Sequence, residues 1–101
     1  MAQTRRISKN NTKIRTAEGV TTIRLHSTDI VSMRTEGRRV TVTLNSGGWH
    51  TSTTKTRMNQ VFNQFDLPLR VFQRDFEWNV WTPDTVQPFV DGSQFTFTAG
   101  A

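Results

Sequence analysis

Short segments in which apolar and polar residues alternate fill the first half of the chain after about residue 19. The clearest has Val40, Val42 and Leu44 separated by threonines, which is the period of two of a strand with one buried face. A Glu36-Gly37 pair before this segment favours a hairpin turn. We predict three strands here, at residues 19–26, 28–35 and 38–45.

The pattern changes to a helical one at about residue 54. Apolar residues then recur at positions i, i+3, i+4 and i+7, which places them on one face of a helix. The stripe consists of Met58, Val61, Phe62 and Phe65. Thr53 or Thr54 is suited to cap the start of this helix, and Leu67-Pro68 ends it. We therefore predict one helix over residues 54–66, packed on a sheet.

Alternation returns after the helix. Strands are predicted at residues 69–73, 77–81 and 94–98, and the short extended piece at 86–90 is expected at a sheet edge because it contains Pro88. The fold class that follows is α+β, an antiparallel sheet of five to six strands with one helix in the order β-β-β-α-β-β-β. We expect a single domain over residues 19–101, after a flexible basic arm over residues 1–18.

The arm carries all of the chain's net charge. Of the 13 basic residues five lie in the first 17 positions, where there is no acid, and the eight basic residues that follow are balanced by eight acids. A basic arm neutralises phosphates of DNA or RNA in many proteins. The alternatives are a solubilising tail or a segment that lies against another protein.

Several classes of chemistry are not expected. The chain has no Cys, so neither a disulfide nor a thiolate metal site is predicted. His26 and His50 have no Cys or acidic pair at metal-ligand spacing beside them. His50 also has no recognisable nucleophile or orienting carboxylate nearby in sequence. No apolar run is long enough for a membrane span. We predict a non-enzymatic protein without catalytic residues, metal or cofactor, and with no membrane partner.

The segment between the third strand and the helix is the densest polar cluster. Its glycines, hydroxyls and cations converge on a helix N-terminus, where free backbone N–H groups favour an anion. The predicted phosphate site consists of Ser52, Thr53, Thr54, Lys55 and Arg57, with Trp49 free to stack on a base. The alternative is an ordinary capped helix with Trp49 in the core.

Two sets of binding residues follow from these arguments. For nucleic acid they are Arg5, Arg6, Lys9, Lys13, Arg15, Arg38, Arg39, Trp49, Lys55 and Arg57. The second half is instead acidic and rich in aromatic residues, most of which must form the core of so small a domain. Any that stay exposed would suit a protein partner or an oligomer formed through an edge strand. The candidates for protein binding are Trp81, Phe95 and Phe97.

Two blocks of sequence resemble a known group of proteins. The runs LNSGGWHTSTTKTRMNQ and RVFQRDFEWNVWTPDTVQPFVDG are similar to a TLxSGGWxTxTTKxRMN block and a later V(Y/F)Q(K/R)xxxWxVxxPD...PFxDG block of small tailed-bacteriophage proteins. The similarity covers about residues 20–92. It implies a phage origin and action in the host bacterial cytoplasm, and it carries over no catalytic residue.

Three functions fit these observations. The first is a phage accessory protein that binds nucleic acid through the basic arm and the helix N-terminus. The second is a phage protein that inhibits or redirects a host protein such as a polymerase, a nuclease or a defence complex. The third is a minor virion component. It would attach to neighbouring subunits through an edge strand and the arm.

Overall fold

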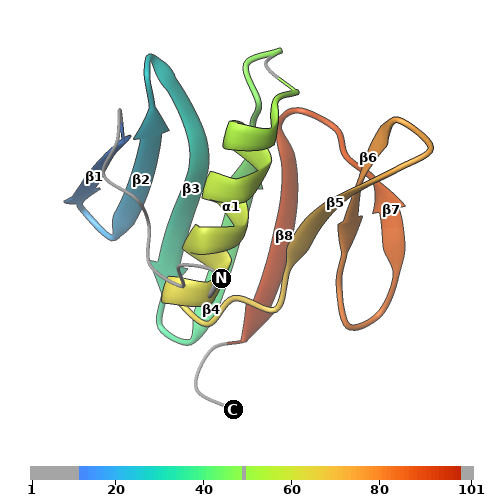
Figure 1. Ribbon diagram of the computed structural model, residues 1–101. Helices are drawn as coiled ribbons and strands as arrows, with labels where there is room; N and C mark the ends of the chain where they lie inside the picture. Colours follow the sequence, from blue (N-terminus) through green and yellow to red (C-terminus); the bar gives the residue numbers. More distant parts are fainter. Residues whose placement is uncertain (1–11, 49, 99–101) are drawn as a thin grey trace.

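The computed structural model describes residues 12–48 and 50–98, which form eight strands and one helix (Figure 1). The strands before the helix are β1 (Thr12–Ala17), β2 (Val20–Leu25), β3 (Thr28–Glu36) and β4 (Arg39–Leu44). Helix α1 spans Ser52–Gln64. The strands after it are β5 (Arg70–Arg74), β6 (Glu77–Trp81), β7 (Val86–Pro88) and β8 (Ser93–Thr98).

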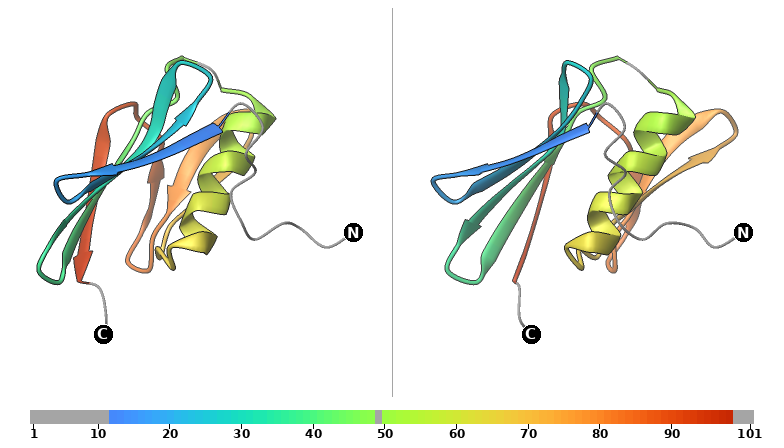
Figure 2. Two further views of the ribbon diagram at one scale, coloured as in Figure 1. Left: turned by 90° about the vertical axis from the view of Figure 1, so that its left-hand side faces the viewer. Right: turned by 60° about the vertical axis from the view of Figure 1, so that its left-hand side comes forward.

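The strands form two antiparallel sheets. One has five strands in the order β1-β2-β3-β4-β8, and the other has three in the order β5-β6-β7. The last strand of the chain therefore returns to pair with β4. The five-stranded sheet is one layer, and the helix with the three-stranded sheet lies against it as the other (Figure 2). The α+β class, with antiparallel strands before and after one helix, is confirmed.

Strand β1 lies inside the segment predicted as an arm, and this part of the prediction needs correction. Residues 12–17 pair with β2 in a hairpin, and only residues 1–11 of the predicted arm fall outside the described residues. The turn is made by Glu18 and Gly19, both at positive φ (52° and 77°), which is the backbone of a tight hairpin turn. Ile14 pairs with the core residue Ile23, and this pairing fixes which face of β1 points inward.

The inner face of the five-stranded sheet supplies half of the buried core residues, all of them from β2, β3 and β4. Alternate residues of these three strands point toward the helix. Strand β3 interrupts this alternation, because Ile30 and Val31 are adjacent and both buried. The register between β2 and β3 shifts after Ile23, as a bulge does when it re-aims one extra residue. The bulge thus places two consecutive apolar residues in the core.

Helix α1 begins two residues earlier than predicted. Its N-cap is Thr51, whose hydroxyl accepts a hydrogen bond from the backbone N–H of Thr54 at 3.2 Å. Met58, Val61 and Phe62 are buried, as the stripe predicted, whereas Phe65 is the C-cap residue and is 37% exposed. The backbone of Phe65 lies outside the helical region (φ −102°, ψ 11°), so the helix ends before it. Phe65 therefore lies at the margin of the core.

The open edge of β5 is covered by the helix. The amide of Asn59 bonds to both backbone groups of Val71: its Nδ2 donates to the carbonyl, and its Oδ1 accepts from the N–H, each at 2.9 Å. The side chain thus replaces one residue of a neighbouring strand, which an edge strand otherwise lacks. This contact joins the helix to the three-stranded sheet.

Replacing Asn59 with Ala leaves the two backbone groups of Val71 without their partner. We expect a loss of about 2–3 kcal/mol in the free energy of unfolding, since each unmade buried hydrogen bond costs about 1 kcal/mol or more. Chemical denaturation followed by circular dichroism measures it. Asn63→Ala is the matched control, because Asn63 is exposed on the same helix, and it should change stability by less than about 0.5 kcal/mol.

The loop after β4 is tied to the loop before β8. The carboxylate of Asp91 accepts hydrogen bonds from the backbone N–H and from the hydroxyl of Ser46, both at 2.8 Å. The backbone N–H of Gly92 donates to the carbonyl of Leu44 at 2.7 Å. These bonds connect the two sequence blocks that carry the phage resemblance, which are far apart in the chain.

Candidate nucleic-acid interface

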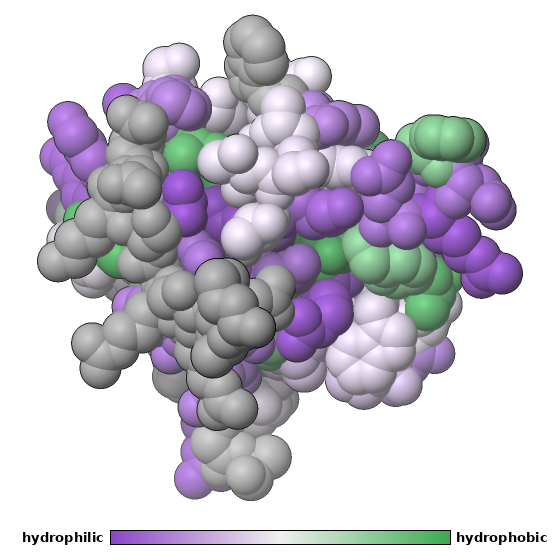
Figure 3. All heavy atoms as spheres, in the orientation of Figure 1, coloured by the Kyte–Doolittle hydropathy of each residue, from purple (hydrophilic) through white to green (hydrophobic). Residues whose placement is uncertain are grey.

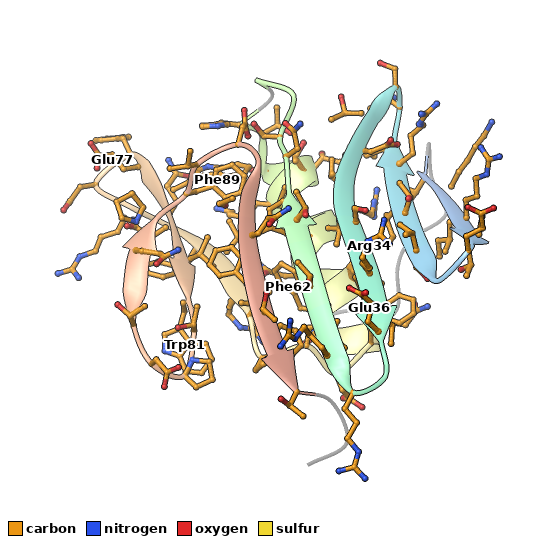
Figure 4. The ribbon with its side chains drawn as sticks, turned by 180° about the vertical axis from the view of Figure 1, so that it is seen from behind. Arg34, Glu36, Phe62, Glu77, Trp81 and Phe89 are labelled. Carbon is orange, nitrogen blue, oxygen red and sulfur yellow. The ribbon has the colours of Figure 1, made fainter. Side chains whose placement is uncertain are left out.

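The outer face of the five-stranded sheet is open and cationic. The register places alternate residues of all five strands on this face, away from the helix. Its basic residues are Lys13, Arg15, Arg24, Arg34 and Arg39. Its acidic residues are Asp29 and Glu36. Figure 4 views this face, with Arg34 and Glu36 labelled on β3. We call it the outer face below.

The cations come from four adjacent strands. Lys13 and Arg15 lie on β1, and one arginine lies on each of β2, β3 and β4. Strands in a sheet are about 4.8 Å apart, so these side chains cover roughly 15 Å across the sheet. All five are exposed. The arrangement concentrates positive charge on a broad surface, where an extended anion has access to several cations at once.

Part of the outer face is hollow. A concavity of about 610 Å³ lies over the β1–β2 hairpin. Its lining consists of Lys13, Ile14, Arg15, Ala17, Val20, Thr22, Arg24 and Asp29. A backbone phosphate of a polynucleotide is smaller than this hollow.

One ion pair lies on the hollow's wall. The Nε of Arg24 donates to Asp29 Oδ1 at 2.8 Å, and both side chains are about half exposed. This hydrogen bond, together with the charge of the carboxylate, raises the pKa of Arg24 above its ordinary value. Arg24 is therefore positioned by Asp29, while the other four cations of the face have no ion-pair partner within the described residues.

Hydroxyl and amide groups fill the rest of the outer face. These are Thr22, Ser32, Thr41, Thr43, Gln94, Thr96 and Thr98. The hydroxyls of Thr41 and Thr96 lie 3.4 Å apart across the β4–β8 pair. Among the described residues this face holds no aromatic ring. Its chemistry is that of hydrogen-bond donors and cations, which suits phosphate oxygens.

The structure brings together only some of the residues predicted to bind nucleic acid. Lys13, Arg15 and Arg39 lie on the outer face, and Arg38 is exposed in the turn between β3 and β4. The prediction missed two cations of the face, Arg24 and Arg34. The period of two contains the signal for Arg24, which stands between the buried Ile23 and Leu25, whereas Arg34 follows the buried Met33 and precedes the exposed Thr35. Arg5, Arg6, Lys9 and Trp49 lie outside the described residues.

The helix N-terminus is separate from the outer face. A second cavity, of about 440 Å³, lies beside it. Its lining is Leu25, His26, Ser27, Thr28, Ile30, Ser46, Thr51, Thr53 and Thr54. Neither Lys55 nor Arg57 lines this cavity. The hydroxyl of Thr51 is occupied by the cap and by the hydroxyl of Thr54 at 3.1 Å.

Arg57 is packed inside the protein rather than displayed. It is 8% exposed, and its Nη1 donates to Oε1 of Gln60 at 3.0 Å. A guanidinium with so little exposed surface is poorly placed to meet a phosphate. Lys55 is half-buried in the first turn. Thr51 thus caps the helix, and of the two cations predicted for the phosphate site Arg57 is buried and Lys55 is half-buried.

The three residues predicted to bind protein are placed differently from one another. Phe95 and Phe97 are partly buried against the core on the inner face, because they pair with the core residues Val42 and Val40. They thus contribute to the packing, and their strand β8 is an edge of the five-stranded sheet. Trp81 is 45% exposed, on the face of β6 opposite to the buried Trp78.

The two histidines lie in different surroundings. The ring of His50 stacks on Trp78 with centroids 4.6 Å apart, and it meets Phe89 edge-on at 5.8 Å. His26 is an exposed turn residue at positive φ. Within the described residues no three or more potential metal ligands are grouped together, and no helix is long and apolar enough to cross a membrane.

The described residues define a small α+β domain with one open, cationic sheet face. A family model described as Kyanoviridae Gp96 protein matches residues 1–96, and the chain belongs to this family of phage proteins. The match extends beyond the two blocks that carry the resemblance, into the N-terminal residues and β8. Comparison with curated proteins and with solved structures gives no match.

Proposed function

We propose that this phage protein binds nucleic acid through the outer face of its five-stranded sheet. One observation carries the proposal: five cations from four neighbouring strands share an exposed face with only two carboxylates, one of which pairs with Arg24. Charge of this kind attracts a polyanion from a distance and holds it through several contacts. The site of action is the host bacterial cytoplasm, where phage nucleic acid is copied and expressed.

The proposed interface includes the basic residues that precede β1 in the sequence. Arg5, Arg6 and Lys9 precede β1 by a few residues, and β1 itself carries Lys13 and Arg15 on the outer face. The proposal keeps the predicted role of the arm in nucleic-acid binding. It replaces the helix N-terminus with the outer face of the sheet as the other part of the interface.

The chemistry of the face indicates contacts to the backbone of the nucleic acid. Guanidinium and hydroxyl groups hydrogen-bond phosphate oxygens, which are the same in every sequence. Proteins that read single strands by stacking place aromatic rings on the sheet, and the outer face has none among the described residues. We therefore expect binding that depends weakly on sequence and accepts a duplex.

The dependence of affinity on salt tests this function. With about four to six phosphate contacts, the affinity for a duplex should fall about 10²–10³-fold between 50 and 200 mM salt, because each contact releases counterions. Fluorescence anisotropy with labelled oligonucleotides of unrelated sequence measures it. No binding at low salt would reject the function and leave the binding of a host protein or a structural place in the virion as the alternatives.

A further inference from the structure

The register places the cations of the outer face along one line. Antiparallel pairing aligns the residues of this face in rows that cross the strands. Taken in order along the strands, successive rows contain Lys13 with Arg24, then Arg15, then Arg34, and then Arg39. From one end of the sheet to the other, the cation thus shifts from β1 and β2 to β3 and finally to β4. The five cations follow a diagonal of the sheet, which we call the cation line.

Sheet geometry gives the length of the cation line. With strands about 4.8 Å apart and residues about 3.3 Å apart along each strand, Lys13 and Arg39 lie roughly 25 Å from each other. The cations between them stand within about 4 Å of the straight path that joins the two ends. One strand of a duplex carries a phosphate for about every 3.4 Å of axis, so roughly seven phosphates of one backbone span this length. The cation line is therefore long enough to contact several phosphates of the same strand.

Neither side of the cation line is suited to a second backbone. On the β8 side the rows continue with hydroxyl and amide groups and with one carboxylate, that of Asp29, which pairs with Arg24. On the other side the rows hold Ala17, Val20 and the carboxylate of Glu36. The described part of the outer face has no further cation on either side. A second row of phosphates therefore meets no positive charge there and, at two places, a carboxylate.

The exposed cations of the other sheet are arranged differently. Figure 3 views the molecule from the side opposite to the outer face, where hydrophobic side chains gather over the three-stranded sheet. Arg70 and Arg74 of that sheet are exposed at the two ends of β5. Two cations on one strand do not follow a backbone as the five of the outer face do. Arg74 thus serves as a reference for the loss of one positive charge away from the cation line.

We propose that the outer face binds a single sugar-phosphate backbone along the cation line, an inference that rests on the function proposed above. The ligand is then one polynucleotide strand, alone or within a duplex whose complementary strand is not contacted. Phosphates of this strand meet the cations. Its sugars and bases turn toward the β8 side, where Ser32, Thr43 and Gln94 offer hydrogen-bond groups. Ala17 and Val20, on the opposite side, offer none.

Moving one cation off the line tests the proposal. The double variant Arg34→Gln, Gln94→Arg keeps the composition and net charge of the chain, and it moves a guanidinium from the cation line to an exposed position on β8, roughly 12 Å away. We expect its affinity for a duplex to fall about fivefold at about 100 mM salt, as far as that of Arg34→Gln alone. Arg74→Gln should change the affinity less than about twofold, because the lost charge is distant and screened. Unchanged melting temperatures exclude a loss of folding.

A comparison of single and double strands gives a second test. A single strand and a duplex of the same length should make the same number of phosphate contacts, so their salt slopes should stand in a ratio of about 0.7 to 0.9. A duplex slope about twice that of the single strand, or a relocated arginine that restores native affinity, would overturn the cation line. Either result leaves the native protein binding nucleic acid, whereas failure of the proposed function shows as no binding of any oligonucleotide at low salt.

Discussion

Replacing Arg15, Arg34 and Arg39 together with alanine lowers the affinity for a DNA duplex about 100-fold at 100 mM salt. Each arginine is exposed on a different strand of the outer face, and each lost phosphate contact removes about one unit of counterion release. The slope of log affinity against log salt should therefore become shallower by about 2.7. Anisotropy titrations at several salt concentrations give both quantities for the native and the variant protein.

Two controls separate charge from other effects. Exchanging the same three arginines for lysine keeps the charge, and it should lower the affinity only a few-fold, because a phosphate accepts either cation. Lys55→Ala removes one cation at the helix N-terminus, away from the outer face, and should leave the salt slope unchanged. If Lys55→Ala weakened binding as strongly as the triple alanine variant does, the interface would lie at the helix and not on the sheet.

Phe62→Ala has the largest effect expected on stability. Phe62 is 2% exposed and belongs to the core cluster beneath both sheets. Truncation of a buried Phe costs about 3–5 kcal/mol, which combines lost burial with the cavity left behind. Domains of this size are stable by about 5–15 kcal/mol, so the variant should be partly unfolded at 37 °C. Thermal unfolding followed by circular dichroism measures the change.

The matched control is one turn along the same helix. Phe65 is 37% exposed at the C-cap, so Phe65→Ala should cost less than about 1.5 kcal/mol. The sequence places both residues in a single apolar stripe and so predicts the same burial for each. Equal losses for the two variants would contradict the placement of the helix on the core.

Local patterns were sufficient to predict most elements. Alternation in VTVTL and EWNVW and the helical stripe around Val61 depend on short-range geometry, and the structure has strands and a helix at these positions. Strand β1 was not predicted, because its polar sequence with two basic residues resembles a disordered tail. Its one large apolar residue, Ile14, is 43% exposed, and only its pairing with Ile23 assigns it to the inner face.

Long-range pairing explains what the sequence did not predict. Phe95 and Phe97 alternate with polar residues on an edge strand, and only the pairing of β8 with β4 shows that they face the core. The amide of Asn59 joins the helix to the edge of β5, and no sequence period marks such a contact. For the same reason the cations were assigned to the arm and the helix, although register gathers them on one sheet face.

The most direct test of the interface is a map of the residues that a bound oligonucleotide perturbs. Isotope-labelled protein titrated with a short duplex at about 50 mM salt should show amide shift changes along β1–β4, centred on Arg15, Arg24 and Arg34. The changes should fade as salt is raised. Shifts confined to the helix N-terminus or to β5–β7, or no shifts at all, would contradict nucleic-acid binding by the outer face.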